Sequence, residues 1–441
     1  MATAVVPAGP ARVLFVAEAV TLAHVGRTVS LARGLAARGY APIIAVDPRF
    51  AAICPTDEWQ TEVIRSIPMA QFLEALANGS PLYDMPTLQA YVEEDLALLR
   101  RTQPAVVVGD FRLSLSVSAR VLGIPYINIT NAYWSPYARQ EWHVPDLPWV
   151  PYMPAAVADL VFRSVRRIVF KTRARSMQAL GRAYGVQGLG PDLLRTYTDG
   201  DITLYADMPE LVPLFDAPAT HRYLGPVAWA PDIALPDWWS DVDRSKGLIY
   251  VTLGSSGSAA RLPDIVEGLA RLGLPVVVAT AGAPGPKTLP RGVHLAPYLP
   301  GDIVARHSAL VVCNGGSPTS HQALTNGVPV LALPANLDQV LNSNYLKAAG
   351  VGDWLRPQAA APRAIERLGA AMLGDRQLRQ RAAAIAQRAQ GYDSAAILAS
   401  AIEALAGGEV SARSATMTSD AHDRAGGNFL IPRTSRPLTA L

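Results

Sequence analysis

A glycine turn in the second half of the chain offers a place for an anion. The stretch from 311 to 346 reads as a strand, a Gly315-Gly316 turn, a helix, a strand and an Asp-Gln loop. The two glycines let the backbone approach a ligand without a Cβ in the way. Ser317 and Thr319 stand near the start of the helix, where free N–H groups and the helix dipole favour a phosphate. The turn alone fits a simple capped helix equally well.

The whole stretch resembles the donor-nucleotide signature of the GT-B fold glycosyltransferases, which include plant secondary-metabolite and bacterial macrolide enzymes. The family pattern is His-Gly-Gly, Ser or Thr, Glu, a Gly-Val-Pro strand start, and Pro-x-x-x-Asp-Gln followed by Asn. The matching residues here are Asn314-Gly315-Gly316, Thr319, Gln322, Gly327-Val328-Pro329, Pro334, Asp338-Gln339 and Asn342. The resemblance therefore implies a site for a UDP- or dTDP-linked sugar, used as a co-substrate with no further cofactor.

The resemblance also implies a role for each matching residue. Tyr298, in a Tyr-Leu-Pro loop, takes the place of the aromatic residue that stacks on the base, although a core tyrosine would look the same. Gln322 replaces the ribose-binding Glu, and Asp338 with Gln339 holds the sugar hydroxyls. Both Gln322 and Asn314, which replaces the family His, keep polar atoms but lose charge-assisted strength. The implied phosphate-binding residues are Gly254, Ser255, Ser256, Asn314, Gly315, Gly316, Ser317 and Thr319.

The first half of the chain supplies a base. Residues 22–35 resemble the family segment whose loop histidine deprotonates the acceptor, and they place His24 there, with Ala23 for the usual Gly and no Pro. Asp110 follows a predicted strand at 105–109 and would orient the imidazole, although an Asp there could instead cap a helix. The family mechanism is inverting and needs no metal: the acceptor oxygen attacks opposite the diphosphate, which helix dipole and hydroxyl donors stabilise.

An aromatic loop follows the next strand. Residues 131–154 are dense in Trp, Tyr and Pro, and Tyr133, Trp134 and Trp142 could line a site for a small apolar, aromatic or lipid-like acceptor hydroxyl. Core packing of the loop is an equal alternative. The segment 161–175 then carries basic residues among Val, Ile and Phe, which could rest on an anionic membrane or form a solvated helix face.

Other chemistry is weakly signalled. Two Asp-x-Asp pairs, Asp199/Asp201 and Asp241/Asp243, lie in a turn-like stretch and in the linker, so we expect no metal site. A GT-B nucleotide-sugar epimerase would use the same fold without an acceptor. A non-catalytic nucleotide-sugar binder would fit the loss of the family His and Glu. His24 with Asp110 speaks against the binder, and the aromatic loop speaks weakly against the epimerase.

These residues must be positioned by two similar halves. Short apolar runs alternate with helical patterns in each half, which predicts an α/β protein with two Rossmann-like doubly wound domains facing across a cleft. We expect an N-terminal acceptor domain at 1–228, a linker rich in Pro, Trp and Asp at 229–246, and a nucleotide-sugar domain at 247–385. A C-terminal helix at 386–407 should return to the first domain, and 408–441 should be disordered.

Composition excludes several classes. The chain has 441 residues and a formal net charge of +3, which gives no sign of nucleic-acid binding. Two cysteines cannot form a disulfide scaffold, and no apolar run reaches the roughly 20 residues of a membrane span. We therefore expect a cytoplasmic protein, with peripheral contact at the inner membrane face if 161–175 binds lipid. The sequence leaves the sugar, the base, the acceptor and the oligomeric state open.

Overall fold

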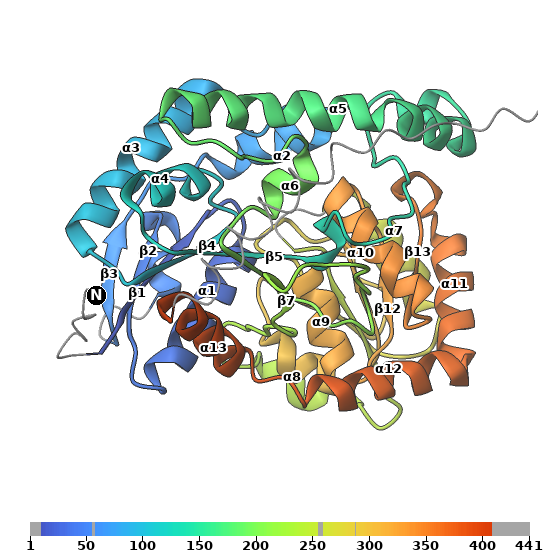
Figure 1. The fold of residues 1–441 in the computed structure, drawn as a ribbon. Coiled ribbons are helices and arrows are strands. Elements are labelled where there is room, and N and C mark those ends of the chain that lie inside the picture. The colour runs from blue at the N-terminus through green and yellow to red at the C-terminus, as the bar shows by residue number, and fades with distance from the viewer. Residues whose placement is uncertain (1–9, 55–57, 255–258, 287, 408–441) are drawn as a thin grey trace, which may run out of the picture.

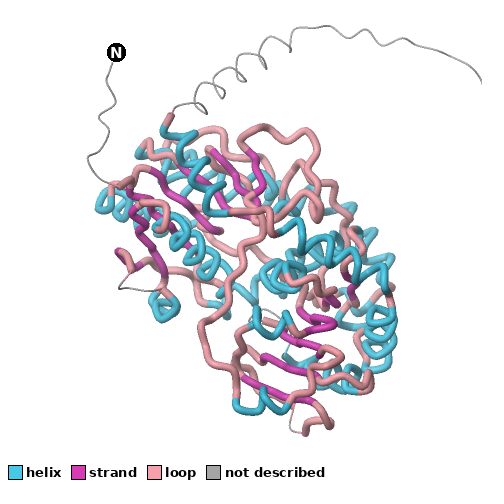
Figure 2. The backbone as a smooth tube through the Cα atoms, turned by 90° about the horizontal axis from the view of Figure 1, so that it is seen from below, coloured by secondary structure: helices cyan, strands magenta, loops and turns pink. Residues whose placement is uncertain are grey.

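The computed structural model describes residues 10–54, 58–254, 259–286 and 288–407. The predicted phosphate contacts Ser255 and Ser256 and the C-terminal segment 408–441 lie outside these residues. The described part confirms the two parallel-sheet α/β units, which Figure 2 shows as two separate groups of strands.

The first sheet has seven parallel strands in the order β3-β2-β1-β4-β5-β6-β7. They are β1 (Arg12–Ala17), β2 (Ala41–Val46), β3 (Gln60–Val63), β4 (Val106–Asp110), β5 (Tyr126–Thr130), β6 (Ile202–Tyr205) and β7 (His221–Tyr223). The helices of this half are α1 (Leu22–Ala36), α2 (Met69–Asn78), α3 (Met85–Thr102), α4 (Leu115–Leu122), α5 (Ala155–Ala183) and α6 (Leu193–Tyr197). Buried Val, Leu and Phe side chains in β1 and buried Val side chains in β4 explain why these strands lie at the centre of the sheet.

The second sheet has six parallel strands in the order β10-β9-β8-β11-β12-β13. They are β8 (Leu248–Thr252), β9 (Val276–Ala279), β10 (Val293–Ala296), β11 (Ser308–Cys313), β12 (Val330–Ala332) and β13 (Gly352–Trp354). Its helices are α7 (Leu262–Ala270), α8 (Gly301–Arg306), α9 (Ser317–Thr325), α10 (Leu337–Ala348), α11 (Pro362–Gly374) and α12 (Arg376–Ala389).

The C-terminal helical pattern is divided. One C-terminal helix was predicted at 386–407, but α12 ends at Ala389 and α13 (Ser394–Ala406) begins after a turn. The side chain of Asp393 accepts a hydrogen bond from the Ala396 N–H at 2.9 Å and so caps the new helix. Leu398 and Ile402 of α13 join the apolar core of the first sheet, and Figure 1 shows α13 beside α1.

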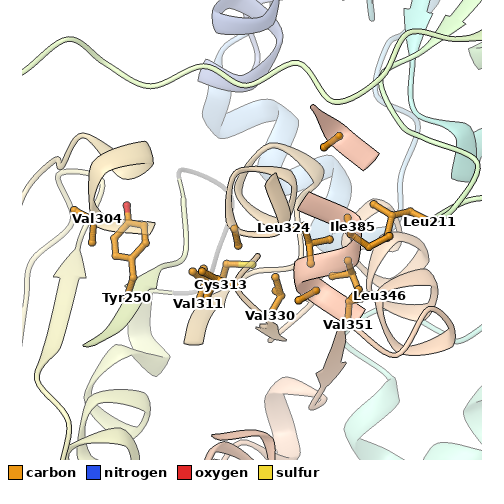
Figure 3. Packing of buried hydrophobic residues seen from close by; sticks show 14 of the residues in the cluster. Leu211, Tyr250, Val304, Val311, Cys313, Leu324, Val330, Leu346, Val351 and Ile385 are labelled. Atoms are coloured by element: carbon orange, nitrogen blue, oxygen red, sulfur yellow. The ribbon is translucent and has the colours of Figure 1, made fainter. Parts of the chain in front are cut away.

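One hydrophobic cluster continues from one half into the other. Figure 3 shows part of it: Val311 and Val330 of the second sheet pack with Leu324 and Ile385, and Leu211 comes from the first half. The aromatic residues of the loop after β5 belong to the same cluster. The two halves therefore share an apolar contact.

Polar contacts also join the halves, mostly through the loop after β5. Arg356 donates to both carboxylate oxygens of Asp159 at 2.8 Å, and the pair is largely buried. Tyr345 donates to the Arg139 carbonyl and Asn344 to the Glu141 carbonyl, each at 2.7 Å. These bonds hold the aromatic loop of the first half against α10 of the second.

Candidate active site

His24 and Asp110 meet at the carboxyl edge of the first sheet. β1 and β4 are neighbours, with Ala17 in register with Asp110, so the chain after β1 begins beside that carboxylate. His24 Nδ1 lies 2.7 Å from Asp110 Oδ1. The histidine was expected in a loop, but it lies in the first turn of α1 because the helix already begins at Leu22, after Thr21 in extended conformation. Its side chain remains 20% exposed while Asp110 is 2% exposed.

Arg27 completes the cluster around the carboxylate. It lies one turn after His24 on α1, and its Nε and Nη2 donate to the two oxygens of Asp110 at 2.6 and 2.9 Å. Burial disfavours the charged form of Asp110, but Arg27 and His24 outweigh it and hold the pKa of this carboxyl below its usual range. The carboxylate is therefore ionised and fixed. Because a carboxylate only accepts, His24 carries its proton on Nδ1, which leaves the lone pair on Nε2.

Aromatic rings surround this cluster. Phe111 follows Asp110 in a left-handed backbone conformation with φ of 61°, which is unusual for a bulky residue. Its ring stacks on the His24 imidazole, with centroids 5.2 Å apart and planes 8° from parallel. Tyr197 packs edge-on against both Phe111 and Trp134. The imidazole thus has an apolar wall on one face.

The glycine turn of the second half, the predicted anion turn at Gly315 and Gly316, lies beside the loop that follows β8. β11 and β8 are neighbours, and a Cβ on Gly254 would lie 3.6 Å from Asn314 Nδ2, so the two loops meet. Gly315 has φ of +80°, and a Cβ there would lie only 2.4 Å from Ser343 Oγ, so only glycine fits. Asn314 Oδ1 accepts from the Gly316 N–H at 3.0 Å. The first turn of α9, with Ser317 and Thr319, follows directly.

Asp338 lies between the two halves. Trp134 Nε1 donates to its Oδ1 at 2.7 Å, and the Tyr133 hydroxyl is a further partner. Burial raises the pKa of this carboxyl, and the partial offsets come from Trp134, Tyr133, His24 and Arg27. Tyr133 also hydrogen-bonds Ser317 at the start of α9. Part of each predicted set is therefore brought together near His24: Tyr133 and Trp134 for the acceptor, Asp338 for the sugar and Ser317 for the phosphate.

Gln339 and Trp142, which were predicted to bind the sugar and the acceptor, have different surroundings. Gln339 is buried, and its Oε1 accepts from the N–H groups of Ala335 and Asn336 at 2.9 and 3.3 Å, as half of a capping box. Trp142 does not join the group around His24, because its ring packs against Phe170 and under Arg166 of α5. These contacts give both residues a role in holding helices in place.

The predicted nucleotide residues lie in the second half, Tyr298 after β10 and Gln322 in α9. Tyr298 is 53% exposed, so its ring offers a free face for a base. A Cβ on Gly301 would lie 2.5 Å from Gln322 Oε1, which places the Gln322 amide against the segment that follows Tyr298. A base on Tyr298 and a ribose near Gln322 would therefore fit one bound nucleotide.

A small cavity lies between the starts of α1 and α9. Its lining includes Ala23, Arg27, Ser317, Pro318 and His321. The cavity therefore lies between the cluster of His24, Arg27 and Asp110 and the helix start that follows the glycine turn. His321 Nε2 lies 3.0 Å from Asp207 Oδ1 of the first half, without hydrogen-bond geometry. His321 is thus packed between the halves and does not take the position of the family histidine.

The Asp-x-Asp pairs serve structural roles where the structure gives them contacts. Asp199 pairs with Arg120, and Asp201 accepts from the Tyr126 N–H at 2.8 Å. Asp243 accepts from the Ser245 N–H at 3.0 Å. Across the described ranges, no three His, Cys, Asp or Glu residues gather in a way that could hold a metal ion.

Sequence reasoning missed Arg27, Phe111 and Tyr197. Arg27 is three residues after His24 on a helical pattern, a spacing that puts both on one face, so the signal existed. Phe111 adjoins Asp110 and was equally visible. Tyr197 had no local signal, because only the packing of α6 brings it to the site.

Comparison with known families supports a relationship over both halves. A family described as "Erythromycin biosynthesis protein CIII-like, C-terminal domain" matches residues 264–405. The chain is 44% identical to a PGL/p-HBAD biosynthesis glycosyltransferase of Mycobacterium tuberculosis, over 85% of this chain and 88% of that protein. It is 45% identical to a PGL/p-HBAD biosynthesis rhamnosyltransferase of Mycobacterium bovis, over 79% and 77%.

Solved glycosyltransferase structures have the same fold. The spinosyn forosaminyltransferase SpnP superposes with a TM-score of 0.64 at 19% identity, covering 90% of this chain and 99% of that one. The spinosyn rhamnosyltransferase SpnG gives 0.63 at 22% identity, covering 89% and 99%. A further SpnG structure holds thymidine diphosphate. These likenesses cover about nine-tenths of this chain.

Proposed function

The chain belongs to the GT-B glycosyltransferase family of its mycobacterial relatives, and on that premise we propose that it transfers a sugar from a nucleoside diphosphate to a hydroxyl, with His24 as the base. The observation that supports this most is the 2.7 Å contact between His24 and Asp110, next to the anion turn. A carboxylate that holds Nδ1–H directs the Nε2 lone pair to proton abstraction.

The proposed reaction replaces one C–O bond at the anomeric carbon by another and moves one proton from the acceptor hydroxyl to His24. His24 Nε2 takes the acceptor hydroxyl proton while the oxygen attacks the anomeric carbon from the side opposite the diphosphate. The bond between that carbon and the phosphate oxygen breaks, so the configuration inverts. Asp110 stabilises the imidazolium, and the N–H groups and hydroxyls at the start of α9 stabilise the leaving diphosphate.

The donor proposal follows from the second half. We infer a pyrimidine nucleotide with its base on the exposed face of Tyr298, its ribose near Gln322 and its diphosphate at Gly254, Asn314 and Ser317. A dTDP-linked deoxyhexose is the first donor to test, since one relative is a rhamnosyltransferase and SpnG binds thymidine diphosphate. UDP-glucose is the second.

Asp338 is the proposed sugar ligand. Its half-buried carboxyl contacts Trp134 and Tyr133 of the first half and lies close enough to His24 and Arg27 to interact electrostatically. A sugar hydroxyl donating to Asp338 would sit between donor phosphate and base. Because Gln339 Oε1 already accepts a hydrogen bond from the backbone at the start of α10, we assign the recognition of the sugar hydroxyls chiefly to Asp338.

The acceptor proposal rests on the aromatic wall. Phe111, Tyr197 and Trp134 form adjoining edge-on contacts beside His24. Such a wall suits an apolar or aromatic alcohol, including a phenol on a lipid. A charged acceptor would gain little from it.

One experiment separates transfer from its alternatives. The protein is incubated with labelled dTDP-rhamnose and UDP-glucose, with and without phenols that carry acyl chains of increasing length. Label in the phenol supports the proposal. An epimerised donor with no acceptor product would identify an epimerase instead. Binding without turnover would identify a non-catalytic binder, a relevant outcome because one relative, 45% identical over 59% of this chain, is called inactive.

A further inference from the structure

Helix α5 exposes a stripe of apolar side chains. Val157, Leu160, Val161, Val165 and Ile168 are exposed by 47, 61, 41, 42 and 69%. At 100° per residue they fall on one side of the helix, opposite Phe162 and Phe170, which are buried. Soluble monomers seldom leave such a contiguous stripe in water.

A row of basic side chains accompanies the stripe. Arg163, Arg167, Lys171 and Arg175 recur every fourth residue, so they line up along α5. All four are exposed, and none forms an ion pair with any residue that the structure describes. The segment 160–191 contains no Asp or Glu. We call the stripe and this row together the outer face of α5.

Two other basic residues of α5, Arg166 and Arg173, are partly buried. Arg166 turns inward over Trp142, 4.0 Å from its ring centroid, and burial lowers the pKa of its guanidinium. Burial likewise lowers the pKa of Arg173. The exposed row is thus a distinct set, with its charges directed to the outside.

The approach to α5 adds an interfacial aromatic residue. Tyr152, just before the helix, is 88% exposed. Tyrosine favours the boundary between lipid and water, where its ring and hydroxyl meet different surroundings. Figure 1 shows α5 along the upper edge of the molecule.

We propose that the outer face of α5 binds the surface of an anionic lipid bilayer, with the helix lying in the interface. The apolar stripe would enter the boundary of headgroups and acyl chains while the basic row meets lipid phosphates. Within the described ranges no helix is long and apolar enough to span a membrane, so the contact is with one leaflet.

The charge pattern favours lipid over the other occupants. A self-associating face would need acidic residues to pair with its basic row, and 160–191 has none. The placement also has a use: the loop before α5 carries Trp134, which lies at the candidate acceptor wall. A lipid-borne acceptor would therefore reach the site from the bound membrane.

Vesicle sedimentation tests the proposal without any turnover. The full chain is mixed with vesicles of phosphatidylcholine alone or with phosphatidylglycerol, at low and physiological salt. We expect binding to the anionic vesicles and its weakening by salt. The variant Arg167→Gln/Lys171→Gln/Arg175→Gln should bind about 10²-fold more weakly, at roughly fivefold per charge. Leu160→Ser/Ile168→Ser should also lose binding.

The matched control removes as much charge elsewhere. Arg363, Arg367 and Arg376 are exposed on α11 and α12 and form no described ion pair; their replacement by Gln should leave vesicle binding unchanged. Circular dichroism shows whether each variant is folded. Equal loss in the control, or equal binding of all proteins to neutral vesicles, overturns the proposal. So does self-association without lipid that the Leu160→Ser/Ile168→Ser change abolishes, which would identify a second copy as the occupant.

Discussion

Replacing Asp110 by Asn tests how the base is held. In the structure both carboxylate oxygens are used: Oδ1 accepts from His24 Nδ1 at 2.7 Å and from Arg27 at 2.9 Å, and Oδ2 accepts from Arg27 Nε at 2.6 Å. An amide has one oxygen, so its NH2 group must face a donor in either orientation. If NH2 faces His24, the imidazole must accept at Nδ1 and the lone pair leaves Nε2.

The magnitude follows from this geometry. In Ser-His-Asp enzymes the same change costs about 10⁴ in kcat through the wrong tautomer, and we expect about 10³–10⁴ here. The change also leaves the Arg27 cation, 8% exposed, without its counter-charge. Breaking a buried pair costs about 3–5 kcal/mol of stability, and the bond that the amide oxygen keeps places the expected loss near 3 kcal/mol.

A second variant separates the two effects. Arg27→Met/Asp110→Asn removes both charges, so its free energy of unfolding should exceed that of Asp110→Asn alone. Its transfer rate should remain low. Urea unfolding and single-turnover transfer are measured on the wild type, both single variants and the double. The account is refuted if Asp110→Asn transfers within tenfold of wild type, or if the stability losses simply add.

Three further predictions concern other parts of the molecule. Asp338→Asn should raise the unfolding temperature, because burial raises the pKa of Asp338 and so penalises its charged form. This gain in unfolding temperature should vanish as the pH falls below 3.8, the ordinary pKa of the group, because the wild-type carboxyl is then also neutral. The transfer rate of this variant should fall about tenfold or more. Tyr298→Ala should weaken nucleotide binding in calorimetry by about 1–3 kcal/mol, and unchanged affinity would remove the base from this ring. Arg356→Gln should cost about 2–5 kcal/mol in urea unfolding by breaking the Asp159 pair between the halves; no loss would show that the pair does not hold them together.

Much of the fold could be predicted from local patterns in the sequence. The apolar run at 12–18 and the valines before Asp110 are buried strands, and parallel strands bring their carboxyl ends to one edge. That rule alone placed His24 near Asp110. The distance and the donor atoms required the register of β1 and β4, which no single segment encodes.

Other features depended on long-range packing. Trp142 was grouped with Trp134 because both lie in one aromatic loop, but the path of that loop takes Trp142 under Arg166 of α5. The sugar-binding role of Gln339 stays a prediction from the family pattern, and the structure adds a capping box with Asn336 at the start of α10. Arg27 reads as a solvated helix residue until β4 supplies its buried partner.

The central claim is that His24 is the base, and His24→Ala tests it most directly. Transfer rate and nucleotide affinity are measured on the same protein, with His307→Ala, an exposed histidine of the second half, as the control. The account predicts a rate about 10²–10⁴-fold below wild type with unchanged nucleotide affinity, because the nucleotide residues lie in the other half. Transfer by His24→Ala at the wild-type rate would contradict it.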